Sequence, residues 1–459
     1  MLLPEDVRLL LSRLQSAGYT AYAVGGCVRD TLLGAEPKDW DLCTSALPDQ
    51  MLDLFREERL VTNGLKHGTV TVILHHTPYE ITTYRVDGAY SDQRHPDSVS
   101  FVDRIDQDLA RRDFTINAMA CAPDGSILDL FGGREDLAAR VIRCVGDPDT
   151  RFGEDALRVL RALRFASVLD FQIDPATDAA VRRHYPDLEK VAAERIRVEL
   201  VKTLCGAGAG RILRAYPEVF TFLLPCLKDS VGYNQDNPHH LYTVWEHSIR
   251  ALEEVPPDPV LRMTMLLHDC GKPAARTTDE SGVGHYKKHQ VLSARMAHDA
   301  LENLRFDKAG AERIELLVAN HDIPITADRK ILLRRLSKFG EENLRSLLLI
   351  HRADRIATGT QPREEAERHY LNRTAALDAL LAERPCYTLK DLKVNGRDVA
   401  ALGYRGKEIG ETLDRLLRAV IDETLPNDRD ALLEAARPEN AQHPKQTADH
   451  TADTKTPED

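Results

Sequence analysis

The pattern of apolar residues changes once along this 459-residue chain, and that change limits the possible folds more than any other feature. Within residues 1–145, helical periodicity alternates with short β-branched runs, among them "GTVTVIL" and "YEITTYRV", which a hairpin-like "HHTP" separates. From about residue 147 to about residue 436, strand patterns nearly vanish and helical periodicity continues, broken at prolines. The sequence therefore predicts an α+β protein: a small mixed α/β head followed by a long all-helical body.

Composition narrows the class of protein further. A chain of this length is expected to form about two to four domains. No apolar run is long enough to span a bilayer, and the N-terminal "MLLPEDVRLLLSRLQ" is amphipathic rather than a signal peptide. Since no such run is present, no membrane partner is expected. The eight cysteines are dispersed, which favours reduced thiols in a cytoplasmic compartment. The net charge of −12 opposes a polyanionic partner at long range, although basic clusters such as "RKILLRR" permit one. No oligomeric state is predicted.

The stretch "YAVGGCVRDTLLGAEPKDWDL" (22–42) combines a glycine turn with two acids. Gly25 and Gly26 let the backbone approach a ligand and turn into a helix, whose free N–H groups suit phosphate. On a β-strand Asp39 and Asp41 would point to the same face, where a cation such as Mg²⁺ relieves their repulsion. Glu80 in "YEITTYR" is a candidate third ligand. The alternatives are two exposed loop aspartates and a surface glutamate.

The stretch "EDALRVLRALRF" (154–165) suggests a way to select nucleotide bases. In a helix beginning at Glu154, Asp155 and Arg158 are neighbours at i,i+3 spacing. A carboxylate accepts from an amino group and a guanidinium donates to a ring nitrogen, which matches cytosine and adenine. Guanine and uracil would leave both groups unmatched, at a cost of roughly 1–3 kcal/mol for each. An exposed i,i+3 salt bridge is the alternative interpretation.

A second group of potential metal ligands lies in the helical body. A His-Asp doublet accompanied by spaced histidines is typical of metal binding, although a single histidine is more often structural. His285 is an alternative to His289 in this group. The candidate ligands are His247, His268, Asp269, His289, His321 and Asp354.

Several motifs occur in an order that resembles one family. After the glycine turn and the D-x-D come "RRDFTINAMA" (111–120), "DLFGGREDL" (129–137) and "RFGEDALRVLRALRFA" (151–166). Together they resemble class II CCA-adding enzymes and bacterial poly(A) polymerases, whose heads are of the DNA-polymerase-β type. The resemblance implies a nucleotidyltransferase head (1–145), a helical neck that recognises the base (146–225), an HD-type domain (226–360), a tRNA-binding tail (361–436) and a disordered end (437–459).

The resemblance also implies an activity: template-independent addition of C, C and A to the 3′ end of tRNA from CTP and ATP. Asp39 and Asp41 would be catalytic and hold Mg²⁺, and Arg111 and Asp113 would order the site. The loop 86–98 matches a flexible loop that helps the enzyme change from C to A addition. The residues expected to contact the nucleotide are Gly26, Arg29, Arg112, Asp155, Arg158, Arg161 and Arg164.

The histidine group, centred on "HDCGK", resembles the HD phosphohydrolase superfamily. This implies a second divalent metal and a metal-dependent phosphatase or cyclic phosphodiesterase activity. The region from 387 to 422 resembles the family's tRNA-binding end, and Lys393, Arg397, Arg405 and Lys407 would supply charge for phosphates. Two alternatives stay open: a poly(A) polymerase or A-adding enzyme, and an HD phosphohydrolase whose head only binds nucleotide.

Overall fold

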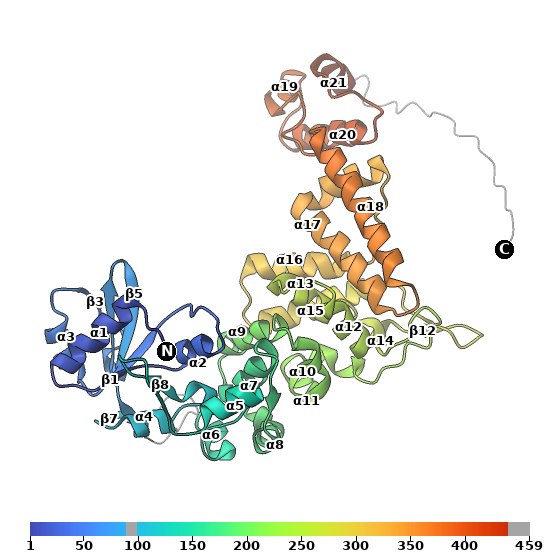
Figure 1. Ribbon diagram of the computed structural model, residues 1–459. Helices are drawn as coiled ribbons and strands as arrows, with labels where there is room; N and C mark the ends of the chain where they lie inside the picture. Colours follow the sequence, from blue (N-terminus) through green and yellow to red (C-terminus); the bar gives the residue numbers. More distant parts are fainter. Residues whose placement is uncertain (89–98, 439–459) are drawn as a thin grey trace. The chain divides into compact units, whose positions relative to one another are not determined.

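The computed structural model describes residues 1–88 and 99–438 (Figure 1). The predicted flexible loop and disordered end therefore lie outside the described residues, except for 86–88 and 437–438. The chain forms two compact units. The first contains residues 1–319 and 357–360, and the second contains residues 320–356 and the chain from 361 onward. A mixed α/β head followed by helices confirms the predicted fold class, and the division into five segments stays a prediction.

The head is built on a seven-stranded sheet in the order β3-β4-β5-β2-β1-β8-β9. Neighbouring strands in this sheet are antiparallel except β2 and β5, which run parallel. The predicted hairpin is present, and His75 and His76 take up positive φ in its two-residue turn. The strands are β1 (Ala21–Val24), β2 (Asp41–Thr44), β3 (Arg59–Val61), β4 (Thr69–Leu74), β5 (Thr77–Thr83), β8 (Met119–Cys121) and β9 (Ile127–Asp129).

The packing of the head depends on apolar residues that recur with the periodicity of strands or of helices. Val70, Val72 and Leu74 alternate along β4 and point into the core. Helix α1 (Glu5–Ser16) buries four apolar residues and packs near β1, and α3 (Pro48–Leu54) packs near β4. A small sheet of β6 (Arg85–Asp87) and β7 (Val99–Phe101) lies next to helix α4 (Ile105–Ala110).

The glycine turn forms where it was predicted, but the two acids differ in their setting. Strand β1 ends at Gly25, whose φ of +80° turns the chain into α2 (Gly26–Leu32). Asp41 opens β2, whereas Asp39 precedes the strand, so the expectation that both acids lie on one strand is wrong. The glycine turn explains why β2 begins only at Asp41. Because β1 leaves the sheet at Gly25, residues 39 and 40 have no neighbouring strand residue with which to pair.

The motif "DLFGGREDL" supports the segment that follows α4. Asp129 accepts hydrogen bonds from the backbone N–H groups of Gly133 and Arg134 and so holds the start of α5 (Gly133–Ala139). Helix α5 packs against the short helix η2 (Thr115–Asn117). Thr115 also donates to Asp136 at 2.7 Å. These contacts fix the backbone next to Asp113.

The neck consists of short helices. Strand β10 (Val141–Ile142) pairs with β11 (Gln172–Ile173), and α7 packs against α9. The prediction of one continuous helix from Glu154 is wrong: α6 ends at Glu154, Asp155 is extended, and α7 begins at Leu157. The helices are α6 (Pro148–Glu154), α7 (Leu157–Val168), α8 (Pro175–His184), η3 (Tyr185–Lys190), α9 (Ala193–Leu204), α10 (Ala209–Ala215) and α11 (Pro217–Leu223).

The first unit continues with a group of packed helices. Helix α13 packs against α9, α12 and α16, and α15 packs against α16. A short hairpin of β12 (Thr277–Thr278) and β13 (Gly284–His285) follows α14. The helices are η4 (Pro225–Ser230), α12 (Val244–Glu253), α13 (Pro259–Leu267), α14 (Lys272–Ala275), α15 (His289–Asn303) and α16 (Lys308–Ala319).

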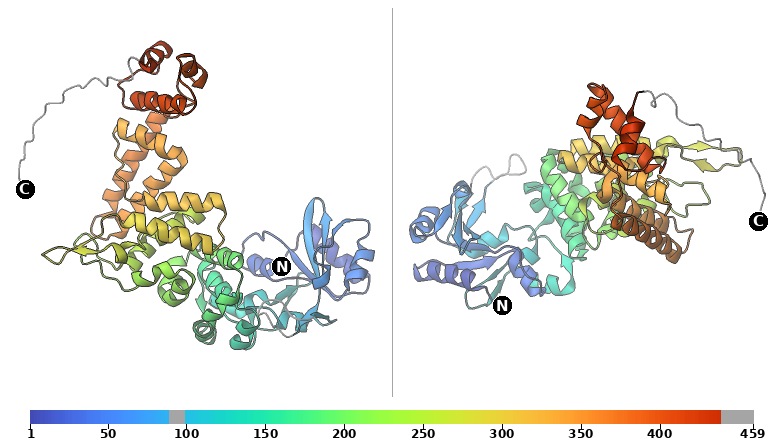
Figure 2. Two further views of the ribbon diagram at one scale, coloured as in Figure 1. Left: turned by 180° about the vertical axis from the view of Figure 1, so that it is seen from behind. Right: turned by 90° about the horizontal axis from the view of Figure 1, so that it is seen from above.

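The second unit is built on two long helices that lie side by side, as Figure 2 shows from behind. Helix α17 (Arg329–Ala357) is interrupted at Gly340, whose φ is +74°. Ion pairs Arg345–Asp378 (2.7 Å) and Arg352–Glu367 (2.5 Å) join it to α18 (Arg363–Ala382) in antiparallel orientation. Helices α19 (Gly396–Ala401), α20 (Lys407–Ile421) and α21 (Arg429–Ala436) pack together. Among the described residues, none of the helices is both long and apolar enough to cross a membrane.

The close packing of α5 on η2 predicts a stability effect. A Cβ on Gly133 would lie 2.3 Å from the backbone oxygen of Thr115, so Gly133→Ala is expected to destabilise the protein by about 1–3 kcal/mol. Gly153 in α6 is the matched control, because a Cβ there meets no atom within 4 Å. Gly153→Ala is expected to be neutral or stabilising by up to ~1 kcal/mol. Urea unfolding measures both, and equal free energies of unfolding would contradict the packing described.

Candidate functional site

Acidic side chains gather at the start of strand β2 and beside it in the middle of strand β5. Asp41 lies directly opposite Glu80 in parallel register, so both side chains point to the same face. They line a cavity of about 190 Å³ together with Asp108, Arg111 and Arg112. Solvent reaches Asp41, but surrounding protein atoms remove part of its hydration. This desolvation and the charges of Asp39 and Glu80 raise the pKa of Asp41.

The glycine turn lies beside this cavity and leaves room for arginines. A Cβ on Gly25 would lie 2.9 Å from Nη1 of Arg112, and one on Gly26 would lie 3.6 Å from Nη2 of Arg29. Positive φ and close approach both favour glycine at position 25. The structure thus brings the glycine turn close to Arg112. The expected contact of Gly26 and Arg112 with a nucleotide stays a prediction.

A buried carboxylate holds the two arginines of "RRDFTIN". Arg111 donates to Oδ1 of Asp108 at 2.8 Å, and Arg112 pairs with Oδ2 at 3.4 Å. Burial alone would raise the pKa of Asp108, but these two guanidinium groups hold that pKa below its ordinary value. Asp108 was not predicted, although its i,i+3 and i,i+4 spacing to the arginines is a readable signal.

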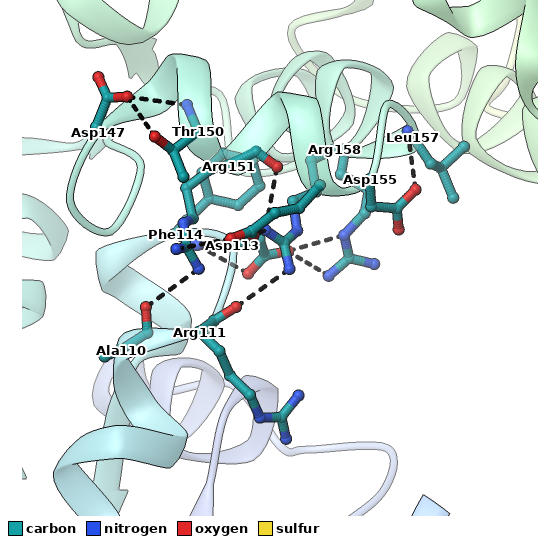
Figure 3. A network of polar contacts seen from close by, with 12 residues as sticks. Ala110, Arg111, Asp113, Phe114, Asp147, Thr150, Arg151, Asp155, Leu157 and Arg158 are labelled. Carbon is teal, nitrogen blue, oxygen red and sulfur yellow. Dashed lines mark hydrogen bonds and ion pairs between the residues drawn. The ribbon is translucent and has the colours of Figure 1, made fainter. Parts of the chain in front are cut away.

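A second cavity of about 290 Å³ adjoins the first, since Arg111 and Arg112 line both. Five arginines and two aspartates contribute to its wall, and Figure 3 shows part of their network. Arg158 donates to the backbone oxygen of Arg111 at 3.1 Å (Figure 3). Its side chain also pairs with Glu154 at 2.6 Å. The complete lining is Arg111, Arg112, Asp113, Asp155, Leu157, Arg158, Arg161 and Arg195.

Asp113 is the centre of the polar network between head and neck. Its Oδ2 accepts a bidentate pair of hydrogen bonds from Arg161, one of them at 2.8 Å from Nε. Its Oδ1 accepts from Asn117 at 3.1 Å, and Asn117 in turn accepts from Arg29 at 2.6 Å. Burial opposes ionisation of Asp113, but Arg161 and Asn117 hold its pKa at about 2.

Three arginines of α7 each have a different carboxylate partner. Arg158 pairs with Glu154, Arg161 with Asp113 and Arg164 with Glu199. The Phe165 ring packs against three guanidinium groups, those of Arg29, Arg161 and Arg164, at 5.0, 5.5 and 3.9 Å from its centroid. One aromatic ring therefore positions arginines from both head and neck.

Asp155 and Arg158 line the same cavity, but they do not form the ion pair that i,i+3 spacing suggested. Because Asp155 stands between two helices, its Oδ1 accepts from the backbone N–H of Leu157 at 3.1 Å. Its Oδ2 accepts from Arg195 of α9 at 3.1 Å. Arg195 was missed, since no local pattern reveals a partner 40 residues away.

Four members of the predicted histidine group come together in the first unit. Asp269 lies 3.4 Å from His247, 3.3 Å from His268 and 3.1 Å from His289. Lys272, which was not predicted, pairs with Asp269 at 2.7 Å, and its i,i+3 spacing in "HDCGK" is the available signal. Burial would raise the pKa of Asp269, but His268 and Lys272 hold it well below its ordinary value.

Three further candidates were considered for this group. His285 pairs with another acid, and His321 and Asp354 belong to the second unit. His285 is half exposed and pairs with Asp279 at 2.7 Å, so the geometry favours His289 over His285. His321 and Asp354 belong to the second unit, where both line a cavity of about 360 Å³.

Three family models match the chain. The "poly A polymerase head domain" matches residues 21–143, and a "probable RNA and SrmB-binding site of polymerase A" matches residues 170–229. The "tRNA nucleotidyltransferase domain 2" matches residues 290–436. The first match coincides with the sheet that carries Asp41 and Glu80.

Known proteins resemble the chain over different lengths. The CCA-adding enzyme of Latilactobacillus sakei is 35% identical over 438 residues, which cover 93% of this chain and 96% of that enzyme. The CCA-adding enzyme of Limosilactobacillus reuteri is 52% identical over 202 residues, which cover 44% of this chain and only half (50%) of that enzyme. The crystal structure of the Bacillus stearothermophilus CCA-adding enzyme in complex with CTP is 29% identical, with a TM-score of 0.71 and coverage of 95% and 97%.

A mixed sheet with acids at a strand end, a glycine turn beside them and an arginine-lined neck define a nucleotidyltransferase of the polymerase A head class. The near full-length similarity then fixes the family. The chain belongs to the CCA-adding enzymes.

The Asp113–Arg161 pair predicts a pH-dependent contribution to stability. Asp113→Asn is expected to destabilise the protein by about 1–3 kcal/mol at pH 7, because it leaves Arg161 without its counter-charge. This loss of stability is smaller than that expected for a fully buried ion pair, because 33% of the Arg161 side chain is exposed to solvent. With a folded pKa of about 2 against 3.8, the wild-type advantage is complete above pH ~5 and declines as the pH falls from ~4 toward ~2.

Urea unfolding of both proteins at pH 7, 5 and 3.5 measures this difference. Asp53→Asn, on the exposed face of α3, is the control and is expected to unfold like the wild type throughout. A wild-type advantage over Asp113→Asn that grows as the pH falls would contradict the assignment.

Proposed function

We propose that this protein adds C, C and A to the 3′ end of tRNA, using CTP and ATP without a nucleic-acid template. The observation that carries the proposal is the pair of adjoining cavities that share Arg111 and Arg112. One cavity holds the acids of a nucleotidyl-transfer site, and the other holds charged groups suited to a base. The similarity to CCA-adding enzymes supports the same conclusion. Eight free cysteines favour action in the cytoplasm.

The acids at the strand end fit a hard divalent cation. Asp41 and Glu80 lie opposite each other. Desolvation and then the charges of Asp39 and Glu80 raise the pKa of Asp41, and a bound cation would relieve that repulsion. Oxygen ligands of this kind favour Mg²⁺. Asp39 and Asp41 would hold the ion, with Glu80 as a candidate third ligand. When bound, Mg²⁺ activates the tRNA 3′-hydroxyl and stabilises charge on the leaving pyrophosphate.

The arginines of both cavities would hold the triphosphate. Arg112 lines both the cavity of the acids and the neck cavity, and it approaches Gly25. Gly26, the next residue, begins α2. Guanidinium groups bind phosphate oxygens through paired, charge-assisted hydrogen bonds. Arg29 and Arg161 are already fixed by Asn117 and Asp113, so they are positioned before the nucleotide enters. Arg164, stacked on Phe165, would complete the set.

Base selection would rest on Asp155 and Arg158. Asp155 accepts from the exocyclic amino group of cytosine or adenine, and Arg158 donates to the adjacent ring nitrogen. Arg195 donates to Oδ2 of Asp155 at 3.1 Å and so positions this carboxylate as an acceptor. The pairing of Arg158 with Glu154 positions its guanidinium at the cavity wall in the same way. Guanine and uracil would leave both groups unmatched.

The predicted tRNA-binding tail contributes exposed positive charge. Lys393, Arg397, Arg405 and Lys407 are exposed in the second unit. Such side chains bind the phosphate backbone irrespective of sequence, as recognition of tRNA by shape requires. We propose that this region binds tRNA.

The proposal is tested with tRNA that lacks its terminal CCA, supplied with CTP, ATP or both. Asp41→Asn and Asp39→Asn are expected to reduce CMP and AMP addition at least ~1,000-fold, because the metal supplies several kcal/mol and each ~1.4 kcal/mol is a factor of ten. Asp53→Asn is the matched control and should retain full addition. CMP addition by Asp41→Asn at the wild-type rate would contradict the assignment.

The same assay separates the alternatives of this chemical class. A CCA-adding enzyme incorporates CMP when CTP is supplied alone, and AMP only after it. An A-adding enzyme or poly(A) polymerase incorporates AMP alone, and the latter continues beyond one residue. Incorporation limited to AMP would replace the first proposal.

We also propose a metal-dependent phosphohydrolase activity, because four predicted ligands come together around Asp269. Donor atoms bound to one ion at ~2.1 Å lie about 3–3.4 Å apart, and the Asp269 contacts of 3.1–3.4 Å match that spacing. His247, His268, Asp269 and His289 would hold a second divalent metal, and His321 and Asp354 stay candidate ligands. Lys272 would keep Asp269 ionised.

The two competing histidines provide a matched test of this activity. His289→Gln is expected to reduce the rate of 2′,3′-cyclic AMP hydrolysis in Mg²⁺, Mn²⁺ or Co²⁺ at least ~100-fold. Even substitution of a residue that only hydrogen-bonds to a metal ligand lowers metal affinity or activity about 10–100-fold. His285→Gln should leave hydrolysis unchanged, and both variants should retain CMP addition. Equal hydrolysis by the two variants would contradict the proposed ligand set.

A further inference from the structure

The small sheet of β6 and β7 presents an arginine and an aromatic ring beside the cavity of the acids. Arg85 lies directly opposite Phe101 in antiparallel register, so the two side chains project from the same face of this sheet. Arg85 also lines the cavity that Asp41 and Glu80 line. Phe101 is therefore a direct neighbour of a residue in the wall of that cavity.

Both side chains meet the segment that leads into β4. Arg85 donates to the backbone oxygen of His67 at 2.6 Å. The Phe101 ring packs on Gly68, where an added Cβ would lie 2.6 Å from a ring carbon. Thr69, the next residue, lines the cavity of the acids. These contacts place the Phe101 ring at the edge of that cavity.

The Phe101 ring stays open to solvent in basic surroundings. Phe101 is 39% exposed, whereas Phe55 and Phe114 of the head are fully buried. Lys66 and His67, which directly precede Gly68, are exposed as well. A flat ring among cations is typical of surfaces that bind single-stranded nucleic acid, because bases stack on the ring and the cations attract phosphates.

The position of this surface favours one occupant, the 3′ end of the tRNA. In the proposed reaction the attacking 3′-hydroxyl must reach the cation held by the acids, so the nucleotide that carries it lies at the edge of their cavity. The end of a tRNA beyond its acceptor stem is single-stranded. Proteins bind RNA of this kind largely by stacking its bases on aromatic side chains.

We propose that Phe101 stacks on the terminal base of the tRNA, while Arg85 and Lys66 bind the phosphates nearest to it. The inference deepens the proposed CCA addition and rests on it. Phe101 is then a substrate-binding residue that orients the attacking nucleotide and takes no part in the chemical step.

Addition of CMP to tRNA that lacks its CCA tests the proposal. Phe101→Ala and Phe101→Leu are expected to lower kcat/KM for tRNA about 10-fold, the effect of losing one stacked base, with KM for CTP unchanged. Phe101→Tyr keeps a flat ring and is expected to behave like wild type. Leu9→Ala, an exposed apolar residue of α1, is the matched control and should also behave like wild type. Full activity of Phe101→Leu would overturn the proposal.

A tRNA whose terminal nucleotide lacks its base separates stacking from folding. Wild type is expected to use this tRNA about 10-fold less well than intact tRNA, whereas Phe101→Leu should use both equally because no stacking is left to lose. Losses that simply add together would overturn the proposal. Thermal unfolding midpoints verify that each variant folds.

Salt dependence tests the phosphate contacts. Lys66→Gln and Arg85→Gln are each expected to lower the slope of log affinity for tRNA against log salt concentration by about 0.7, as the loss of one phosphate contact to a single strand does. An unchanged slope in both variants would contradict these contacts.

A measurement without catalysis separates this inference from the proposed function. The fluorescence of 2-aminopurine, placed as the terminal nucleotide of the tRNA, is expected to fall when wild type binds in EDTA, because stacking quenches this base. Phe101→Leu should leave the fluorescence unchanged. Quenching that depends on Phe101, without any nucleotide addition by wild type, would uphold this surface and contradict CCA addition. CMP addition together with equal fluorescence in both proteins would do the reverse.

Discussion

The ion pair between Asp113 and Arg161 is the interaction on which the rest of the site depends. It joins the head segment that carries Arg111 and Arg112 to the neck helix that carries Arg158 and Arg164. Through Asn117 it extends to Arg29 beside the glycine turn. A buried carboxylate is costly unless it is paired and hydrogen-bonded, and here both oxygens are used. The head and neck groups are therefore held in one geometry before any nucleotide enters.

Acids elsewhere in the site position arginines in the same manner. Asp108 holds Arg111 and Arg112, Glu154 holds Arg158, and Glu199 holds Arg164. Fixing the cations in advance reduces the cost of ordering them when a triphosphate binds. Asp41 is the opposite case, because its charged neighbours at the strand end are mainly other carboxylates. The proposed function assigns an anion to the first group and a cation to the second.

Much of the fold could be predicted from the sequence, because its signals are local. Alternation along β4, the turn at Gly25 and the proline breaks between helices all depend on residues close together in the chain. The predictions from sequence were wrong where residues far apart in the chain determine the local structure. Asp155 stands between two helices and pairs with Arg195, which no periodicity reveals. Asp39 lies outside β2 because β1 turns away, and only tertiary packing separates His289 from His285.

The proposed activity requires a carboxylate and a guanidinium in the neck cavity to read the base while Asp39 and Asp41 bind metal. A crystal structure of this protein with CTP and Mg²⁺ tests it most directly. We expect the cytosine amino group at Asp155, its ring nitrogen at Arg158, and an ion at Asp39 and Asp41. A cytosine bound outside the cavity of Asp155 and Arg158, or no ion at those two acids, would contradict it.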